Sequence, residues 1–450
     1  MTSSLPCHVL LVIDGLCPER SGVYGLARWL ARFLSTYSRQ HSISLRLTYT
    51  STKLQKDRDG DEKLQRLVDE IDFQVLHPTH LGYARRKNES GLSVSDLTWH
   101  DKQYFRNLND IKNVTHVVLF APLTQDSCLP GGLVERIKSC SPNYRKPKVI
   151  LVHQMLFTSA NDDSLNSIRG HQFDKTELAE MLPYLDTIAS VGDKLYGDTA
   201  QIVRDHAINH ICLYPTYNEY DMHRKSSSKI SNYTILSLFS SFNIMKHREF
   251  LKSIAKCASN ITNKIKSKSG TGNRLCWLVC CPGLTNHDKN QLLSSLLFEC
   301  EPGTLNIEIN TGINQDVRLL VSDCSLCIQP GDFDIDGFSG LELLLCGIPT
   351  LVQKTSDVGF IIKNVDVLYS GYFCLSDHVT GQSALWTGQI EQVLLERQDT
   401  DKRTAELADK YRNHQRCVEG LTELLKTFFG RFASLKFCLR PVYLYCFFMV

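Results

Sequence analysis

The first half of the chain alternates short apolar runs with longer segments in which apolar residues recur every three or four positions. The short runs predict buried strands, and the longer segments predict helices that bury one face. Strands that alternate with helices along a chain indicate a parallel, doubly wound α/β sheet. The predicted strands are residues 8–14, 43–48, 73–76, 115–120, 148–153 and 211–215, and the predicted helices are 23–34, 61–71 and 133–139.

The second half begins the same pattern again after a polar, serine-rich stretch at 216–230. Such a stretch is typical of a linker, so the sequence predicts an N-terminal Rossmann-like domain at 1–218 and a C-terminal one at 230–430. The predicted strands here are 233–239, 275–281, 325–329 and 348–352, and the predicted helices are one from residue 246 onward and those at 316–323, 341–346, 389–395 and 404–432.

The last residues, 436–450, form an apolar tail that Arg440 and Pro441 interrupt. The uninterrupted part is too short to span a bilayer. Three interpretations stay open: the tail packs on the body of the protein, touches a membrane surface, or comes from a wrong gene model.

Composition and charge narrow the class of protein. The length of 450 residues suffices for two domains. Because 50 basic residues nearly balance 48 acidic ones, with no basic cluster among aromatic residues, a nucleic-acid partner is not expected. The 17 cysteines are scattered and odd in number, which indicates free thiols in a reducing compartment. The N-terminus has the pattern of a first strand rather than a signal peptide, so we expect a cytoplasmic protein.

The most specific motif runs from residue 321 to 352 and predicts a strand, a glycine-rich acidic loop, a buried helix and another strand. Glu342 lies in the predicted first turn of this helix, and Gly347 and Pro349 end it. A glycine loop that leads into a helix presents free backbone N–H groups and the positive end of the helix dipole to an anion. Carboxylates in the same loop suit the hydroxyl groups of a ribose or a sugar. The alternative interpretation is a plain βα unit with solvated carboxylates.

This order of acid, glycine loop with phenylalanine, second acid and Gly-x-Pro stop resembles the donor-sugar site of retaining GT-B glycosyltransferases of the family-four type. Segments 185–195 and 211–215 also resemble strands of that family. Glycosyltransferase-like domains of invertebrate multidomain proteins are similar. The resemblance implies two Rossmann-like domains that face a cleft, with a C-terminal helix that crosses back onto the first domain. It also implies that a nucleotide-diphosphate sugar is the donor and that its sugar passes with retention to an acceptor, which the sequence does not identify.

The resemblance assigns roles to residues of the predicted C-terminal domain. Glu342 would hold the ribose. Asp334, eight residues before Glu342, would contact the sugar, or Asp336 would do so if the loop differs in length. Lys246 and the backbone where the loop meets the helix would bind the diphosphate. The backbone positions concerned are Ser339, Gly340 and Leu341.

Two features of the predicted N-terminal domain complete the implied site. His153, at the end of a strand, would face the reacting carbon and act with Asp334 in catalysis. Gly22 follows Ser21 where the family carries two glycines that let the backbone approach the donor phosphates. The alternatives are a strand-end histidine bonded to backbone and an ordinary βα turn. Because Lys246 and the helix N–H groups would supply positive potential, the resemblance implies neither a metal nor a further cofactor.

Departures from the family pattern leave other functions open. Ser241 stands where the family has an arginine five residues before Lys246, and Ser21 replaces a glycine. A chain without this arginine could serve as a nucleotide-sugar-binding or regulatory module that performs no turnover. A sugar-nucleotide epimerase of the same fold is a third possibility, although no acid/base pair of carboxylates can be identified for it.

Two pairs of residues have the spacing of metal ligands. Cys324 and Cys327 form a single C-x-x-C inside a predicted strand, so a zinc site is not expected. His206 and His210 lie four residues apart without the glutamate of an H-E-x-x-H motif. We therefore expect these two histidines to lie on a solvated helix face.

Overall fold

The coordinates are a computed structural model of the chain. The ranges that the structure describes are 7–13, 22–51, 73–76, 113–120, 134, 138, 146–153, 175–215, 232–239, 244, 247–269, 274–281, 284–311, 324–330, 338–376 and 383–430. The linker 216–230 and the tail 436–450 lie outside these ranges, and so do Asp334, Asp336 and Lys246.

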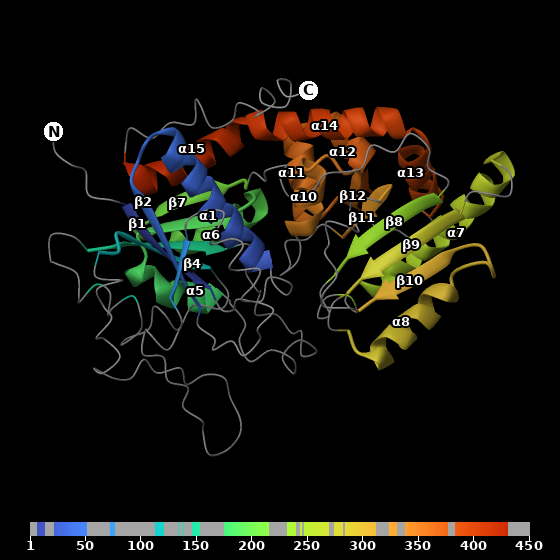
Figure 1. The fold of residues 1–450 in the computed structure, drawn as a ribbon, viewed down its shortest axis with the longest axis horizontal. Coiled ribbons are helices and arrows are strands. Elements are labelled where there is room, and N and C mark those ends of the chain that lie inside the picture. The colour runs from blue at the N-terminus through green and yellow to red at the C-terminus, as the bar shows by residue number, and fades with distance from the viewer. Residues whose placement is uncertain are drawn as a thin grey trace, which may run out of the picture. The chain divides into compact units, whose positions relative to one another are not determined.

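The chain divides into two compact units (Figure 1). Unit 1 comprises Met1–Pro18, Val23–Pro215 and Gln415–Val450. Unit 2 comprises Glu19–Gly22 and Thr216–His414. Each unit holds one parallel sheet with helices around it.

The sheet of unit 1 has seven strands in the order β3-β2-β1-β4-β5-β6-β7. All of its pairings are parallel. Helices cover both faces of such a sheet, so its central strands are buried and consist of continuous apolar runs. The strands are β1 (Cys7–Ile13), β2 (Leu45–Ser51), β3 (Phe73–Leu76), β4 (His116–Phe120), β5 (Lys148–His153), β6 (Thr187–Val191) and β7 (Asn209–Leu213).

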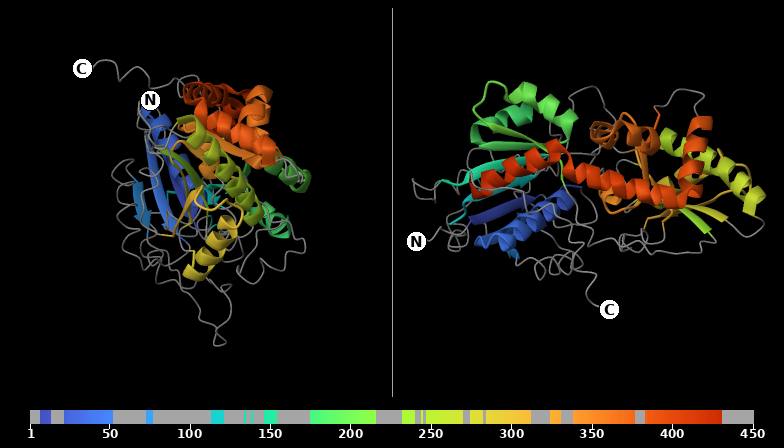
Figure 2. Two further views of the ribbon diagram at one scale, coloured as in Figure 1. Left: turned by 90° about the vertical axis from the view of Figure 1, so that its right-hand side faces the viewer. Right: turned by 90° about the horizontal axis from the view of Figure 1, so that it is seen from above.

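Helices lie on both faces of this sheet. Leu178 and Met181 of α5 share a core with Leu10 and Val12 of β1. In the right-hand view of Figure 2, α1 in blue lies on the other side of the strands from the green helices. The helices of this unit are α1 (Gly22–Gln40), α5 (Lys175–Met181), α6 (Asp193–Val203) and α15 (Gln415–Phe429), with a 3₁₀ turn at Leu182–Tyr184.

The final helix, α15, belongs to unit 1 although the chain directly before it lies in unit 2. It packs against β7. Arg416 at its start pairs with Asp193 of α6, which also accepts a hydrogen bond from the Tyr214 hydroxyl. The Cys417 thiol donates to the Tyr214 carbonyl at 3.6 Å. The predicted C-terminal helix that crosses back onto the first domain is therefore confirmed.

The sheet of unit 2 has six parallel strands in the order β10-β9-β8-β11-β12-β13. In chain order they are β8 (Asn232–Leu238), β9 (Arg274–Cys280), β10 (Asn306–Asn310), β11 (Leu326–Ile328), β12 (Thr350–Gln353) and β13 (Cys374–Leu375). The helices are α7 (Arg248–Ser269), α8 (Asn286–Leu297), α10 (Phe338–Leu345), α11 (Asp357–Val365), α12 (Val367–Phe373), α13 (Ser383–Leu395) and α14 (Arg397–Asn413). With unit 1, this arrangement confirms the predicted α/β fold of two Rossmann-like parallel sheets.

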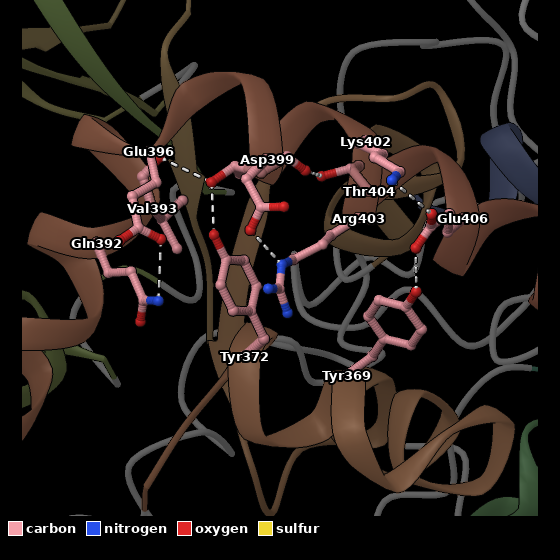
Figure 3. Close-up of polar contacts among 11 residues, drawn as sticks. Tyr369, Tyr372, Gln392, Val393, Glu396, Asp399, Lys402, Arg403, Thr404 and Glu406 are labelled. Atoms are coloured by element: carbon pink, nitrogen blue, oxygen red, sulfur yellow. Dashed lines mark hydrogen bonds and ion pairs between the residues drawn. The ribbon is translucent and has the colours of Figure 1, made fainter.

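Helix α14 attaches to α12 through polar and ring contacts rather than through an apolar face alone (Figure 3). The Tyr369 hydroxyl donates to Glu406 Oε2 at 2.6 Å, and the Tyr372 hydroxyl lies 2.6 Å from Thr400 Oγ1. The Arg403 guanidinium lies over the Tyr372 ring, with Cζ 4.7 Å from the ring centroid. These contacts let a strongly charged helix dock on the rest of unit 2.

The predicted strands agree with the strands of the structure to within three residues at each end. Two predictions about helices are wrong. The single helix predicted for 404–432 is two helices, because the backbone at His414 is extended, with φ −65° and ψ 136°. The helix of the donor motif begins at Phe338, so Glu342 lies in its second turn and not in its first. The helices predicted at 61–71 and 316–323 lie outside the described residues.

No helix in the part of the chain that the structure describes is long and apolar enough to cross a membrane.

Candidate functional site

The strand order of unit 2 reverses between β8 and β11. From β8 the chain passes through α7 to β9, on one side of β8, whereas from β11 it passes through α10 to β12, on the other side. Right-handed crossovers in opposite directions place the two helices on opposite faces of the sheet. In open α/β sheets, ligands bind outside the carboxyl ends of the strands at such a reversal. The ends of β8 and β11 are therefore the candidate site.

A buried polar group lies just below these strand ends. The Ser237 hydroxyl of β8 donates to the Ile328 carbonyl of β11 at 2.7 Å and accepts from Trp277 Nε1 at 3.1 Å. Ser237 and Trp277 are both 0% exposed, and Trp277 is the largest fully buried side chain among the described residues. The indole thus orients the serine hydroxyl toward β11, so that the two strands are joined where they diverge.

Helix α10 begins at this end of β11 with a glycine close to the sheet. A Cβ on Gly340 would lie 3.6 Å from the Gln329 Cβ, an ordinary packing distance. Leu341 is fully buried, whereas Glu342 is half-buried. The free N–H groups of the first turn of a helix favour anions. The structure thus places Gly340 beside the end of β11, with Leu341 and Glu342 following it in α10, and the donor-binding roles of these residues stay predictions.

Hydrogen bonds fix the C-terminal end of α10. Gly347 adopts φ +80°, a conformation that favours glycine, and the Ile348 N–H bonds to the Leu343 carbonyl at 3.0 Å. Arg412 of α14 donates from Nη2 to the Leu345 carbonyl at 2.8 Å. A helix with a fixed C-terminal end keeps its N-terminal end at a constant place beside β11.

Other predicted residues cannot be placed in the same way. Lys246, Asp334 and Asp336 lie outside the described residues. Gly22 and Ser339 lie in the first turns of α1 and α10, and only their place in these helices is described. Their proposed roles stay predictions.

His153 is the last residue of β5 and is completely buried. Its Nε2 lies 2.7 Å from Ser190 Oγ of β6 and 3.3 Å from Thr199 Oγ1 of α6. These contacts are those of a structural strand-end histidine, the alternative interpretation, except that Nε2 bonds to the hydroxyl groups of Ser190 and Thr199 where backbone was expected. The role of His153 beside a reacting carbon stays a prediction.

The same hydrogen-bond chain contains a second histidine that the sequence analysis misplaced. His210 lies on β7 and not on a solvated helix face, and its Nε2 is 2.9 Å from Ser190 Oγ. Its ring stacks on Tyr196, with centroids 4.1 Å apart. Burial lowers the pKa of His210 to about 4, so it is neutral at pH 7. This strand was predicted to begin at Ile211, because the apolar run starts only after the polar pair Asn209 and His210.

The two cysteines of the C-x-x-C pair are buried core residues. Cys324 and Cys327 are buried in one cluster with Leu236 and Leu343. Burial raises the pKa of the Cys327 thiol well above its usual value, which keeps it protonated. Within the described ranges, no three histidine, cysteine or acidic side chains are grouped so as to hold a metal ion.

No protein-family model and no curated protein matches the chain. Solved structures do match it. HepE from Anabaena, in complex with UDP and glucose, has a TM-score of 0.56 at 12% identity, over 94% of this chain and 99% of HepE. The pneumococcal O-GlcNAc transferase GtfA, in complex with UDP and GlcNAc, has a TM-score of 0.56 at 9% identity, over 94% and 99% of the two chains. TarM from S. aureus, in a complex that includes UDP, has a TM-score of 0.57 at 9% identity, again over 94% and 99%. Together with the two parallel sheets, these likenesses show that the chain has the GT-B fold.

Proposed function

We propose that this chain is a glycosyltransferase that binds a nucleotide-diphosphate sugar in unit 2 and transfers the sugar, with retention, to an acceptor. The observation that carries the proposal is the strand-order reversal between β8 and β11, with the start of α10 and Glu342 beside it. A GT-B fold with a nucleotide site at this place is suited to a donor of that class.

The diphosphate would be held by the backbone N–H groups of Ser339, Gly340 and Leu341 and by Lys246. When the bond between the anomeric carbon and the diphosphate oxygen breaks, negative charge grows on the departing diphosphate. Fixed donors aimed at that charge stabilise the transition state more than the ground state. The acceptor oxygen forms the new bond to the anomeric carbon, and its proton leaves with the diphosphate. This assignment requires no metal ion for charge stabilisation.

Glu342 would accept hydrogen bonds from the ribose hydroxyls. Asp334 or Asp336 would bind the sugar hydroxyls, and His153 would act from unit 1. One carboxylate would therefore recognise the ribose and another the sugar, so that the site would select both halves of the nucleotide sugar.

Uridine diphosphate is the first nucleotide to test. HepE, GtfA and TarM are all described in complexes with UDP. Their identity to this chain is low, so GDP and ADP belong in the same experiment.

The test is isothermal titration of the purified protein with UDP, GDP and ADP, repeated on Glu342→Ala. We expect one nucleotide to bind and the variant to lose this binding. Glu249→Ala is the matched control, since Glu249 is also a helix carboxylate of unit 2, pairs with Lys252 at 2.8 Å and is 77% exposed. Equal affinity of Glu342→Ala and the wild type would refute the proposed site.

A second assay separates an enzyme from a binding module. Ser241 in place of an arginine motivates the module, because it removes a cation from the implied diphosphate site. Transfer or hydrolysis of a nucleotide sugar, lost in Lys246→Ala, would establish the enzyme. Nucleotide binding without either reaction, over a panel of donors, would establish the module instead.

A further inference from the structure

The side chain of Gln329 continues the pairing of β8 and β11 beyond the point where their backbones separate. The parallel ladder between these strands ends at Leu236 and Cys327. In the amide orientation that satisfies both of its polar atoms, the Gln329 side chain donates to the Leu238 carbonyl at 2.9 Å and accepts from the Leu238 N–H at 3.1 Å. The buried Gln329 side chain thus forms hydrogen bonds with both the N–H and the carbonyl of Leu238.

The hydrogen bonds of the neighbouring residue show in which direction the N–H and carbonyl of Leu238 point. The N–H of Phe239 bonds to the Cys280 carbonyl of β9 at 2.8 Å. Because bonding directions alternate along a strand, the N–H and carbonyl of Leu238 point the other way, toward β11. The Ile328 carbonyl of β11 accepts from the Ser237 hydroxyl. The Gln329 side chain bonds to the N–H and the carbonyl of Leu238.

Gln329 is itself anchored to the strand on its other side. Its N–H bonds to the Leu351 carbonyl of β12 at 2.9 Å, and the following Pro330 carbonyl accepts from the Gln353 N–H at 3.0 Å. The residue is only 5% exposed. Its Cβ also faces the first turn of α10, since a Cβ added to Gly340 would lie 3.6 Å from it. Gln329 therefore joins β8, β12 and the start of α10.

The two joined strands lead into the two segments that carry the implied donor residues. The segment after β8 contains Lys246, and the segment after β11 contains Asp334 and Asp336. We propose that Gln329 is a positioning residue, which sets the spacing between the groups that bind the diphosphate and the groups that bind the sugar. This inference rests on the proposed function.

The chemistry of an amide makes the idea testable. An amide donates and accepts at once, as a peptide group does, whereas methionine has similar length and can do neither well. An ionised carboxylate only accepts, but a protonated carboxyl group can both donate and accept. Gln329→Glu should therefore restore the bridge only at a pH low enough to protonate the introduced group, whose pKa burial raises.

The experiment compares the wild type, Gln329→Met and Gln329→Glu by hydrogen exchange of the peptide that covers β8 and by titration with UDP, GDP and ADP. In Gln329→Met, we expect the Leu238 amide to exchange at least about tenfold faster and nucleotide affinity to fall about tenfold, the effect of losing a bond worth about 1.4 kcal/mol. Gln329→Glu should resemble Gln329→Met at pH 8 and approach the wild-type exchange rate, corrected for pH, as the pH falls to 5.

Gln389→Met is the matched control. The Gln389 amide also bonds to backbone, donating to the Tyr372 carbonyl at 2.9 Å and the Cys374 carbonyl at 3.1 Å, but at the β13 edge of the sheet. We expect this variant to lose stability and to keep its nucleotide affinity and its β8 exchange.

Two results would overturn the inference: unchanged β8 exchange in Gln329→Met, or an equal loss of affinity in Gln389→Met. Failure of the proposed function has a different signature, which is that the wild type binds none of the three nucleotides. That result would remove the role of Gln329 in positioning the groups that bind the nucleotide sugar. The exchange rates of β8 and their recovery at low pH would still report whether Gln329 joins β8 to β11.

Discussion

The contact between α15 and β7 leads to a quantitative prediction for Gly420→Ala. A Cβ on Gly420 would lie 2.1 Å from the Cys212 carbonyl oxygen. Carbon and oxygen normally approach to about 3.3 Å, so the helix or the strand would have to move by about 1.2 Å. Neither can yield easily, because the obstacle is strand backbone and not the end of a flexible side chain.

The expected minimum cost follows from two opposing terms. Overpacking of this kind costs about 3 kcal/mol, and alanine offsets about 1 kcal/mol of it through its better helix propensity. The net loss of unfolding free energy should therefore be at least about 2 kcal/mol. If α15 detached, Leu421, Leu424 and Phe428, all buried, would lose about 1.5–3 kcal/mol each. That sum of about 5–9 kcal/mol is the upper limit and approaches the stability of a whole domain.

Gly197→Ala provides a control that we expect to raise the unfolding free energy, whereas Gly420→Ala should lower it. Gly197 lies inside α6 of the same unit, and a Cβ there would meet no atom within 4 Å. Alanine should therefore stabilise unit 1 by up to about 1 kcal/mol. Urea unfolding followed by circular dichroism, with hydrogen exchange of the α15 peptide to identify the transition, measures both variants. Equal or greater stability of Gly420→Ala relative to Gly197→Ala would refute the close docking of α15.

Two further changes test other parts of the fold. Ser237→Ala removes the hydroxyl that bonds to Trp277 Nε1 and the Ile328 carbonyl in a buried place. It should lower the unfolding free energy of unit 2 by about 1–3 kcal/mol, and an unshifted denaturant midpoint would contradict this. His116 is buried, which lowers its pKa to about 4 from 6.5. The unfolded chain therefore binds more protons between these values, and stability should fall by up to about 3 kcal/mol as the pH drops from 6.5 to 4. His116→Asn should remove this part of the pH dependence, and an identical pH profile would contradict the assignment.

The fold was predictable because parallel strands are buried on both faces. The run Lys148–His153 has apolar residues at four successive positions, and it forms β5 with those bounds. Strand β10, at one edge of the unit 2 sheet, was not predicted, and α14 was predicted only from residue 404 onward. Strand β10 alternates asparagine and glutamate with isoleucine, and charged residues make up much of α14, so neither has a continuous apolar signal. Their positions depend on contacts with distant residues, such as the hydroxyl pair of Tyr372 and Thr400.

The candidate site was predictable only in part, for a related reason. The glycine loop, the helix and Glu342 are close in sequence, so one motif reveals them together. Gln329 gives no such signal, because its role depends on the register between β8 and β11, which are far apart in the chain. His153 and His210 meet through Ser190 in the same way, across three neighbouring strands.

The most direct test of the central claim is the melting temperature of the purified protein with UDP, GDP, ADP and their sugar conjugates. A ligand at a hundred times its dissociation constant adds about 2.7 kcal/mol of stability to the state that binds it. The proposed donor site predicts a clear rise with one base, larger for the matching sugar conjugate and absent in Glu342→Ala. A cooperative melt that none of these ligands shifts would contradict the claim that this chain binds a nucleotide sugar.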